Sequence, residues 1–257
     1  MNTNAQLSPW RAVSLALCYF SMATYKRIML KLSGEVFSGD RDFGIHKPTL
    51  DDIASQVIAV QKLGVQVVIV VGGGNIWRFR DTRETDIERT VSDSMGMLAT
   101  IMNSVALQSA LEAQGAETRT LSAIDVPQMA EPFIKRRAIR HLEKGRVVIC
   151  AGGTGNPYFT TDSAAALRAL ELGCDVLLKA TNVDGVFNAD PNKDPSATMF
   201  TEITYQEVIE KHLGVMDQAA FSLCQEQKLP IVVFNFLQRG SLLKAAKGDK
   251  IGTVVHS

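Results

Sequence analysis

Three short segments of the chain combine glycine with cationic or hydroxyl side chains, a mixture that suits the binding of phosphate groups. The first is Lys31-Leu32-Ser33-Gly34, and the second is Gly72-Gly73-Gly74-Asn75, with Arg78 close behind it. The third spans residues 154–162 and supplies hydroxyl groups, backbone amides and the carboxylate of Asp162. Glycine lets N–H groups approach phosphate oxygens because it has no Cβ, and the N-terminus of a following helix adds a favourable dipole. Together the segments predict a site for two ligands with several phosphates, where phosphoryl transfer needs positioning and positive charge more than covalent chemistry.

Each of these segments also has a purely structural interpretation. A triple glycine after a strand can form a simple turn, and Asp162 can be a helix N-cap, because aspartate is a preferred residue there. Lys31 can be a surface lysine whose stem lies along apolar side chains. The shared position favours the functional interpretation, since each segment follows a predicted strand.

Apolar periodicity along the chain alternates between strand and helix. Strands are expected at residues 27–32, 65–71, 118–124, 147–151, 175–179, 231–234 and 252–255. Helices are expected from Pro48 to a stop at Gly64, around 95–106 with a stop at Gly115, and at 131–143 and 162–172. This alternation predicts a mainly parallel sheet with helices on both faces. Right-handed crossovers place the carboxyl ends of parallel strands along one edge, where ligands of open α/β sheets bind.

The first 21 residues stand apart from this pattern. Residues 10–22 are mostly apolar with one arginine, as in part of a signal peptide. A signal peptide would also need a cleavage site of small residues after this run, and none follows. We expect residues 1–21 to be an N-terminal extension, either upstream of a true start at Met22 or a poorly ordered tail. Residues 22–257 are expected to form a single domain, with an N-terminal lobe at about 22–151 and a C-terminal lobe at about 152–257.

Composition excludes several classes of protein. The 257 residues are 46% hydrophobic and carry 27 basic and 27 acidic side chains, a balance that argues against disorder and against a dedicated nucleic-acid binder. Basic residues at 135–137 and 140 fit a solvated helix face better than a nucleic-acid patch. The four cysteines form no C-x-x-C pair, which favours a reducing cytoplasm. The sequence has no run of 18 apolar residues, so no membrane span is predicted. It also contains no P-loop motif, no dinucleotide-binding motif and no G-x-S-x-G motif.

An ordered series of motifs then gives the chain a recognisable resemblance. The motifs are KLSGE at 31–35, VGGGN at 71–75, DSMGMLAT at 93–100, GTGNPYFTTD at 153–162, KATNVDGVF at 179–187, NADP at 188–191 and VMD at 215–217. From Tyr25 to the C-terminus the chain resembles the bacterial UMP kinases of the amino-acid kinase superfamily. The resemblance implies a three-layer αβα sandwich that transfers the γ-phosphoryl group of ATP to UMP with Mg²⁺, in pyrimidine nucleotide biosynthesis.

The resemblance also implies roles for particular residues. The N-terminal lobe would be the UMP side and the C-terminal lobe the ATP side. ATP would be bound by Lys31, Leu32, Ser33, Gly34, Gly74, Arg78, Thr181, Phe187 and Asp190. UMP would be bound by Gly73, Asp93, Thr154, Gly155, Asn156, Pro157, Tyr158, Phe159, Thr160 and Thr161. Lys31 and Asp162 would form the catalytic centre, with Asp217 as a weaker candidate, and no side chain is assigned as a metal ligand.

Family members are typically hexamers that GTP activates and UTP inhibits, so a homohexamer with this regulation is expected. One departure is Phe79, which stands after Trp77-Arg78 where the family commonly has glycine. Two alternatives stay open at this point. One is a related kinase that acts on an amino-acid carboxylate or carbamate, and the other is a non-catalytic nucleotide- or oxyanion-binding protein on the same scaffold.

Overall fold

The computed structural model describes residues 24–78, 86–189, 191, 193–194 and 196–257. The expected extension at 1–21, Phe79 and Asp190 lie outside these residues. Within them, nine strands form one sheet in the order β4-β3-β5-β2-β1-β6-β8-β9-β7. The strands are β1 (Arg27–Leu32), β2 (Gln66–Val71), β3 (Thr118–Ser122), β4 (Glu131–Pro132), β5 (Val147–Ala151), β6 (Val176–Thr181), β7 (Glu202–Thr204), β8 (Ile231–Asn235) and β9 (Thr253–His256).

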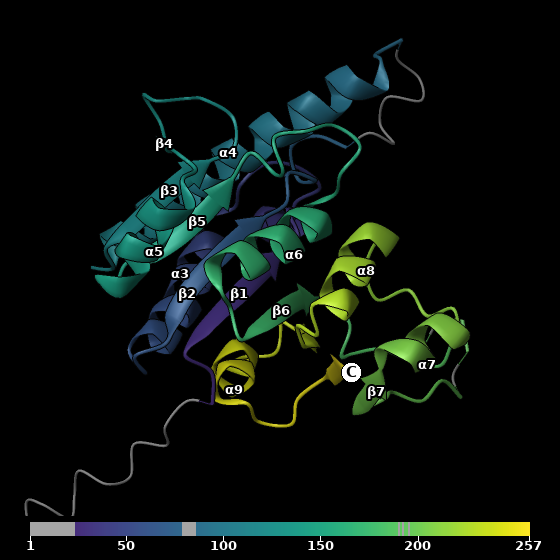
Figure 1. Cartoon of the computed structure of the whole chain (residues 1–257). Coiled ribbons are helices and arrows are strands. Elements are labelled where there is room, and N and C mark those ends of the chain that lie inside the picture. Colours follow the sequence, from purple (N-terminus) through teal and green to yellow (C-terminus); the bar gives the residue numbers. More distant parts are fainter. Residues whose placement is uncertain (1–23, 79–85, 190, 192, 195) are drawn as a thin grey trace, which may run out of the picture.

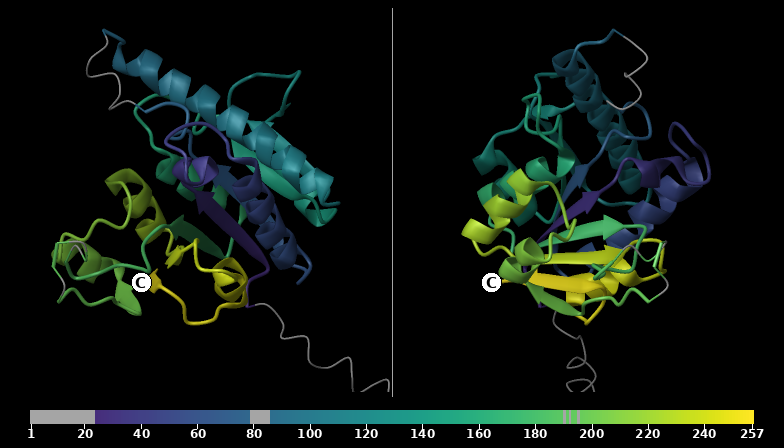
Figure 2. Two further views of the ribbon diagram at one scale, coloured as in Figure 1. Left: turned by 180° about the vertical axis from the view of Figure 1, so that it is seen from behind. Right: turned by 90° about the vertical axis from the view of Figure 1, so that its right-hand side faces the viewer.

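Helices cover both faces of this sheet (Figures 1 and 2). They are α2 (Glu35–Ser38), α3 (Lys47–Gln61), α4 (Arg89–Ala113), α5 (Lys135–Glu143), α6 (Thr161–Leu172), α7 (Tyr205–Glu210), α8 (Gln218–Glu226) and α9 (Ser241–Lys247). Successive residues of a strand point to opposite faces. Accordingly, Ile28 and Leu30 pack with α3, α4 and α9, whereas Met29 packs with α6 and α8. The expected αβα sandwich with a mainly parallel sheet is confirmed.

The sequence pattern located most of these elements but erred at several ends. Helix α4 begins at Arg89 rather than near Met95, and in Figure 2 its N-terminal half runs out beyond the strands. The helix expected at 131–143 begins only at Lys135, because Glu131 and Pro132 pair with β3 as a short edge strand. The last strand in the chain, β9, is not the outermost one: it lies antiparallel to β8, and β7 lies beyond it at the edge of the sheet. Pairing partners, which local periodicity does not encode, decide these ends.

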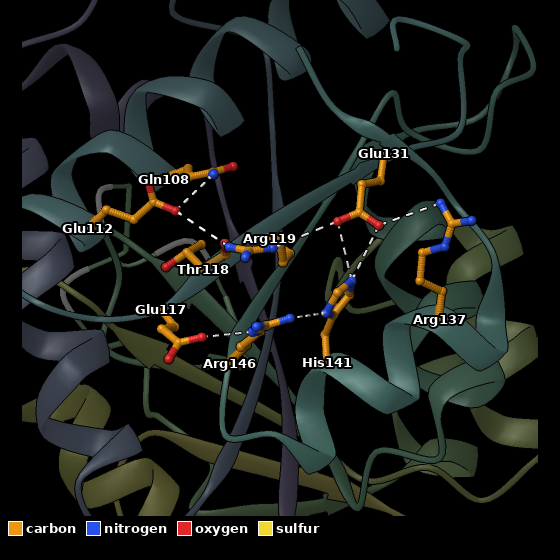
Figure 3. A network of polar contacts seen from close by, with 9 residues as sticks. All are labelled: Gln108, Glu112, Glu117, Thr118, Arg119, Glu131, Arg137, His141 and Arg146. Carbon is orange, nitrogen blue, oxygen red and sulfur yellow. Dashed lines mark hydrogen bonds and ion pairs between the residues drawn. The ribbon is translucent and has the colours of Figure 1, made fainter. Parts of the chain in front are cut away.

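A network of charged side chains covers the β3–β4 edge of the sheet, between α4 and α5 (Figure 3). Glu131 lies at its centre. Its carboxylate oxygens are 3.5 Å from the Nη1 atom of Arg137 and 3.3 Å from the Nε2 atom of His141. Farther along α5, Arg140 pairs with Glu143 at 3.4 Å. These carboxylates offset part of the positive charge of the basic residues at 135–137 and 140. This favours a solvated helix face over a nucleic-acid patch. That the chain does not bind nucleic acid stays a prediction.

No helix in the described part of the chain is long and apolar enough to cross a bilayer.

Candidate active site

The first two glycine-rich segments touch each other at the carboxyl edge of the sheet. Gly34 follows β1, and the triple glycine follows β2, the strand paired with β1. A Cβ on Gly34 would lie 2.4 Å from the backbone nitrogen of Gly74 and 2.9 Å from the carbonyl oxygen of Gly72. No side chain fits in that space, so position 34 requires glycine. The close contact places the backbone of both segments on one surface.

Side chains of helix α4 form hydrogen bonds with the backbone of the triple-glycine segment and of Gly152, the residue that follows β5. The buried amide of Asn103 donates to the carbonyl oxygen of Gly72 at 2.8 Å and exchanges hydrogen bonds with the amide of Asn75. One turn earlier, the hydroxyl of Thr100 accepts a hydrogen bond from the backbone N–H of Gly152 at 2.9 Å. Sequence reasoning missed Thr100 and Asn103 as positioning residues. The available signal was that both are polar residues on the inward face of a helix.

At the centre of this edge, Asp162 lies between two lysines. Its Oδ1 atom is 2.8 Å from Nζ of Lys31, and its Oδ2 atom is 2.7 Å from Nζ of Lys179. All three side chains are only 12–13% exposed. The structure therefore joins the two residues expected to form the catalytic centre and adds Lys179, to which no role had been given. The sequence signal that could have indicated Lys179 is its position near the end of an apolar strand, which is also the position of Lys31.

This surrounding changes the acid–base properties of the cluster. Burial by itself would raise the pKa of Asp162, but attraction to Lys31 and Lys179 and their hydrogen bonds outweigh it, so the pKa lies below its ordinary value. Burial lowers the pKa of Lys179, and repulsion from Lys31 adds to this effect while attraction to Asp162 opposes it. Two cations and one anion leave a surplus positive charge, which suits the binding of phosphate.

Asp162 is not the N-cap of helix α6. Thr160 has that role, since its hydroxyl accepts hydrogen bonds from the backbone N–H groups of Asp162 and Ser163. The purely structural interpretation of Asp162 as a cap is therefore wrong. Its carboxylate is free of the helix backbone and pairs with the lysines instead.

Asp217 lies one step farther from this centre. It is the N-cap of α8, where Oδ1 accepts from the backbone N–H of Ala220 at 3.0 Å. Its carboxylate also accepts hydrogen bonds from the hydroxyl groups of Thr160 and Ser163. Asp217 thus ties the start of α8 to the start of α6, rather than pairing directly with either lysine in the contacts described.

Two cavities open beside the cluster. The larger, of about 560 Å³, is formed mostly by residues within 181–189, by Pro191 and by residues 211–215, and it includes Lys179, Thr181 and Phe187. The smaller, of about 240 Å³, lies between the triple glycine, the start of α4 and the 153–161 segment. Its lining residues are Gly73, Gly74, Trp77, Arg89, Ser92, Asp93, Gly96, Met97, Thr100, Gly153, Thr154, Asn156, Phe159, Thr160 and Thr161. Lys179 thus lines the larger cavity, whereas the smaller includes Thr161, the neighbour of Asp162 in the chain.

The structure distributes the expected site residues unevenly over these cavities. Gly155, Pro157 and Tyr158 do not line the smaller one, and the side chain of Leu32 packs in the core. Tyr158 contributes through its backbone, whose N–H donates to Asp93 at 2.9 Å. Arg89, which sequence reasoning missed, holds both oxygens of Asp93 at 2.8 and 2.9 Å.

Arg78, which is expected on the phosphate side, is held by two contacts. Arg78 donates from Nε to the carbonyl oxygen of Gly74, and its Nη2 atom lies 2.6 Å from Oε1 of Glu35. This places a guanidinium beside the two touching glycine segments, although the next residue along the chain lies outside the described part.

Known proteins share this fold. The model of the amino acid kinase family matches residues 26–235. A UMP kinase structure from Bacillus anthracis is 38% identical with a TM-score of 0.88, covering 90% of this chain and 96% of that one. A UMP kinase structure from Ureaplasma parvum is 37% identical with a TM-score of 0.86, covering 90% and 99%. The uridylate kinase of Archaeoglobus fulgidus is 31% identical with a TM-score of 0.69, covering 89% and 99%.

The chain belongs to the amino acid kinase family, since the family model covers most of its length. Within that family it groups with the UMP kinases, at 37–38% identity over nine tenths of the chain.

Proposed function

We propose that this enzyme transfers the γ-phosphoryl group of ATP to UMP, giving UDP and ADP for pyrimidine nucleotide biosynthesis. The observation that carries the proposal is the Lys31–Asp162–Lys179 cluster. Lys179 lines the larger cavity, and Thr161, next to Asp162 in the chain, lines the smaller. A phosphate oxygen of UMP forms the new bond to phosphorus as the bond to the ADP oxygen breaks. No general base is needed, because the UMP phosphate is already anionic at neutral pH.

Each cavity takes one nucleotide in this proposal. The larger takes the adenosine of ATP, with Thr181 and Phe187 in its lining. Asp190, which lies outside the described residues, is assigned to ATP from the family resemblance. The smaller takes UMP, with Asp93 and the 154–161 segment around the nucleoside. Gly73 and Gly74 line the smaller cavity, and Arg78 donates to the carbonyl oxygen of Gly74, which suits the binding of phosphates. Lys31 neutralises charge on the transferred group, while Asp162 sets the position of the lysines, and Asp217 acts on Thr160 and Ser163.

Mg²⁺ is proposed to enter with ATP. The described residues contain no group of three or more carboxylate, histidine or cysteine side chains that could hold a metal. Both oxygens of Asp162 are taken by lysines, and those of Asp217 by hydroxyl and amide groups. This donor set fits an ion held by phosphate oxygens and water, as Mg²⁺ commonly is in kinases. When bound, the ion neutralises phosphate charge, and the chain supplies the cations and amides around it.

A homohexamer in the cytoplasm, activated by GTP and inhibited by UTP, is also proposed from the family resemblance. Support for assembly comes from the outer face of α4, where Val91, Leu98 and Met102 are 50–57% exposed. Exposed apolar side chains on one helix face suit an interface between subunits. Light scattering tests the hexamer, and initial rates with added GTP or UTP test the regulation. The lobe boundary near Ala151 and the extension at 1–21 stay predictions.

A coupled assay tests the activity and its alternatives. ATP with Mg²⁺ is offered UMP, CMP, AMP, glutamate or aspartate, and ADP formation is followed. UMP alone is expected to support rapid turnover. Turnover with an amino-acid acceptor would instead identify a different kinase of the family, and nucleotide binding without turnover would identify a binding protein.

A further inference from the structure

Gly96 lies inside helix α4, where a glycine is unfavourable. It is the only glycine in Arg89–Ala113 and belongs to the DSMGMLAT motif at 93–100, of which only Asp93 had been given a role. A glycine in a helix interior destabilises the helix relative to alanine, because its backbone loses more conformational freedom on folding. The surroundings of Gly96 show what the protein gains from a glycine at this position.

The common structural reasons for a glycine do not apply to Gly96. Its φ is not positive and it lies within a continuous helix, so a side chain would cause no backbone strain. Apart from its chain neighbours and the backbone of its own helix, no atom of the described residues would lie within 4 Å of a Cβ at this position. Gly73 is the opposite case, since its Cβ would lie 2.7 Å from the carbonyl oxygen of Gly96. The close contact between α4 and the triple-glycine segment therefore requires glycine at 73, not at 96.

The space beside Gly96 is the smaller cavity, of about 240 Å³. The residues of α4 that line it follow the helical repeat of three and four: they are Arg89, Ser92, Asp93, Gly96, Met97 and Thr100. Residues at this spacing form one stripe along a helix, and Gly96 lies in the middle of the stripe. A side chain at position 96 would therefore project into the cavity.

The cavity leaves little room for such a side chain. Its volume is below the roughly 300–1,000 Å³ that is usual for small-molecule sites. The triple-glycine segment and residues within 153–161 form its other walls. A ligand that fills this space has to approach the backbone of α4 closely, and a methyl group on residue 96 would occupy part of the same volume.

We propose that Gly96 is a specificity-determining residue, whose missing side chain leaves the space in which the nucleoside of UMP packs against the backbone of α4. Asp93, on the same stripe of the helix, then contacts the nucleoside from the neighbouring turn. The helix is less stable with glycine at this position, and the open space is what it gains. The proposal rests on the proposed function, because UMP is the ligand assigned to this cavity.

Substitution by alanine separates this role from a structural one, because the two roles predict opposite changes in stability. Gly96→Ala should raise the Tm without nucleotides by roughly 1–4 °C, since alanine favours the helix and displaces nothing. A glycine needed for packing would instead lower the Tm. The KM for UMP should rise roughly 10–100-fold, as expected when one methyl group is forced into a closely packed site.

The experiment measures thermal melts, UMP binding by titration, and kcat and KM for both substrates. In Gly96→Ala the kcat at saturating UMP should change much less than the KM for UMP, because binding rather than the chemical step is affected. The KM for ATP should stay within about threefold of the wild type, since Gly96 does not line the larger cavity. Gly96→Leu should keep the fold and the binding of ATP but fill the smaller cavity, so that UMP binding is lost.

Ser109→Ala is the matched control. Ser109 is an exposed residue of the same helix, about 20 Å farther along its axis. Alanine also has the higher helix propensity there, so the Tm should rise slightly while the KM for UMP stays unchanged. This control shows that a more stable α4 does not by itself weaken UMP binding.

A glycine that serves only to let α4 bend would give a different result. Gly96→Ala would then lower kcat while the UMP affinity stayed at the wild-type value, and that outcome overturns the proposal. A lower Tm in Gly96→Ala, or UMP binding that survives in Gly96→Leu, overturns it as well.

The binding titration keeps this proposal separate from the proposed function. A wild type that binds UMP but forms no UDP overturns the proposed function, while weaker UMP binding in Gly96→Ala still supports the role of Gly96. An active wild type whose UMP affinity is unchanged by Gly96→Ala overturns only the role of Gly96. A wild type that does not bind UMP overturns both.

Discussion

Replacement of Asp162 by asparagine tests the centre of the proposed mechanism. The substitution keeps the shape of the side chain but removes the charge shared by Lys31 and Lys179, which lie 2.8 and 2.7 Å from its oxygens. Thr160 still caps α6, so the helix end is unaffected. The two lysines then repel each other and lose their common acceptor. Because their positions set the charge around the transferred phosphoryl group, turnover should fall by roughly 10²–10³.

The same substitution has a stability signature that the structure allows us to estimate. Removing one partner of a buried ion pair costs about 3–5 kcal/mol. The lower value applies here, because the cavities let water reach the lysines. A loss of about 3 kcal/mol lowers the Tm of a domain of this size by roughly 6–12 °C. ATP supplies phosphate charge to the same lysines, so it should raise the Tm of the variant more than that of the wild type.

Steady-state kinetics of UDP formation and thermal melts with and without Mg²⁺–ATP check both parts. Asp51→Asn is the matched control, because it removes the carboxylate of an exposed pair with Lys47 and should change stability by less than about 1 kcal/mol. Near-wild-type turnover in Asp162→Asn would refute its place in the catalytic centre. A loss of activity that follows a loss of stability, and that ATP does not reverse, would refute the electrostatic reasoning.

Three further predictions concern the same site. Lys31→Ala should lower kcat by roughly 10²–10³, and a kcat within about threefold of the wild type would remove Lys31 from the centre. UMP should be strongly preferred over CMP in initial-rate competition, since a site that hydrogen-bonds a substrate group rejects an analogue with the wrong donors; equal turnover would contradict a UMP-specific enzyme. Burial and repulsion from Lys31 lower the pKa of Lys179, while attraction to Asp162 and Asp217 opposes this shift. The kcat/KM for ATP should therefore fall as pH rises, and the fall should begin below the pH range in which an ordinary lysine loses its proton. Lys179→Arg cannot lose its proton in that range, so its profile should lack this alkaline fall, and an unchanged profile would assign the fall to another group.

Much of the architecture follows from local sequence. Apart from Gln66, every residue of the run at 65–71 is Val or Ile, and three glycines follow it, which predicts a strand buried on both faces. Strand β2 (Gln66–Val71) is that strand. Strands that alternate with helices then form a mainly parallel sheet, and their carboxyl ends meet along one edge. This reasoning is enough to bring residues 31–34 and 72–74 together without knowledge of any contact.

Tertiary structure decided which side chains meet at that edge and what each one does. Lys31 and Lys179 are far apart in the chain, and only the pairing of β1 with β6 makes them neighbours. Asp162 had two equally plausible roles, and the choice between them depended on Thr160, whose hydroxyl occupies the capping position. Asn103 reaches Gly72 only because α4 packs across the triple-glycine loop. Periodicity reports which face of an element is apolar, but such polar contacts join elements whose relative placement is set by strand order and helix packing. The sequence alone therefore determined the layers and the phosphate-binding edge, whereas the cluster of two lysines around one aspartate exists only in the folded chain.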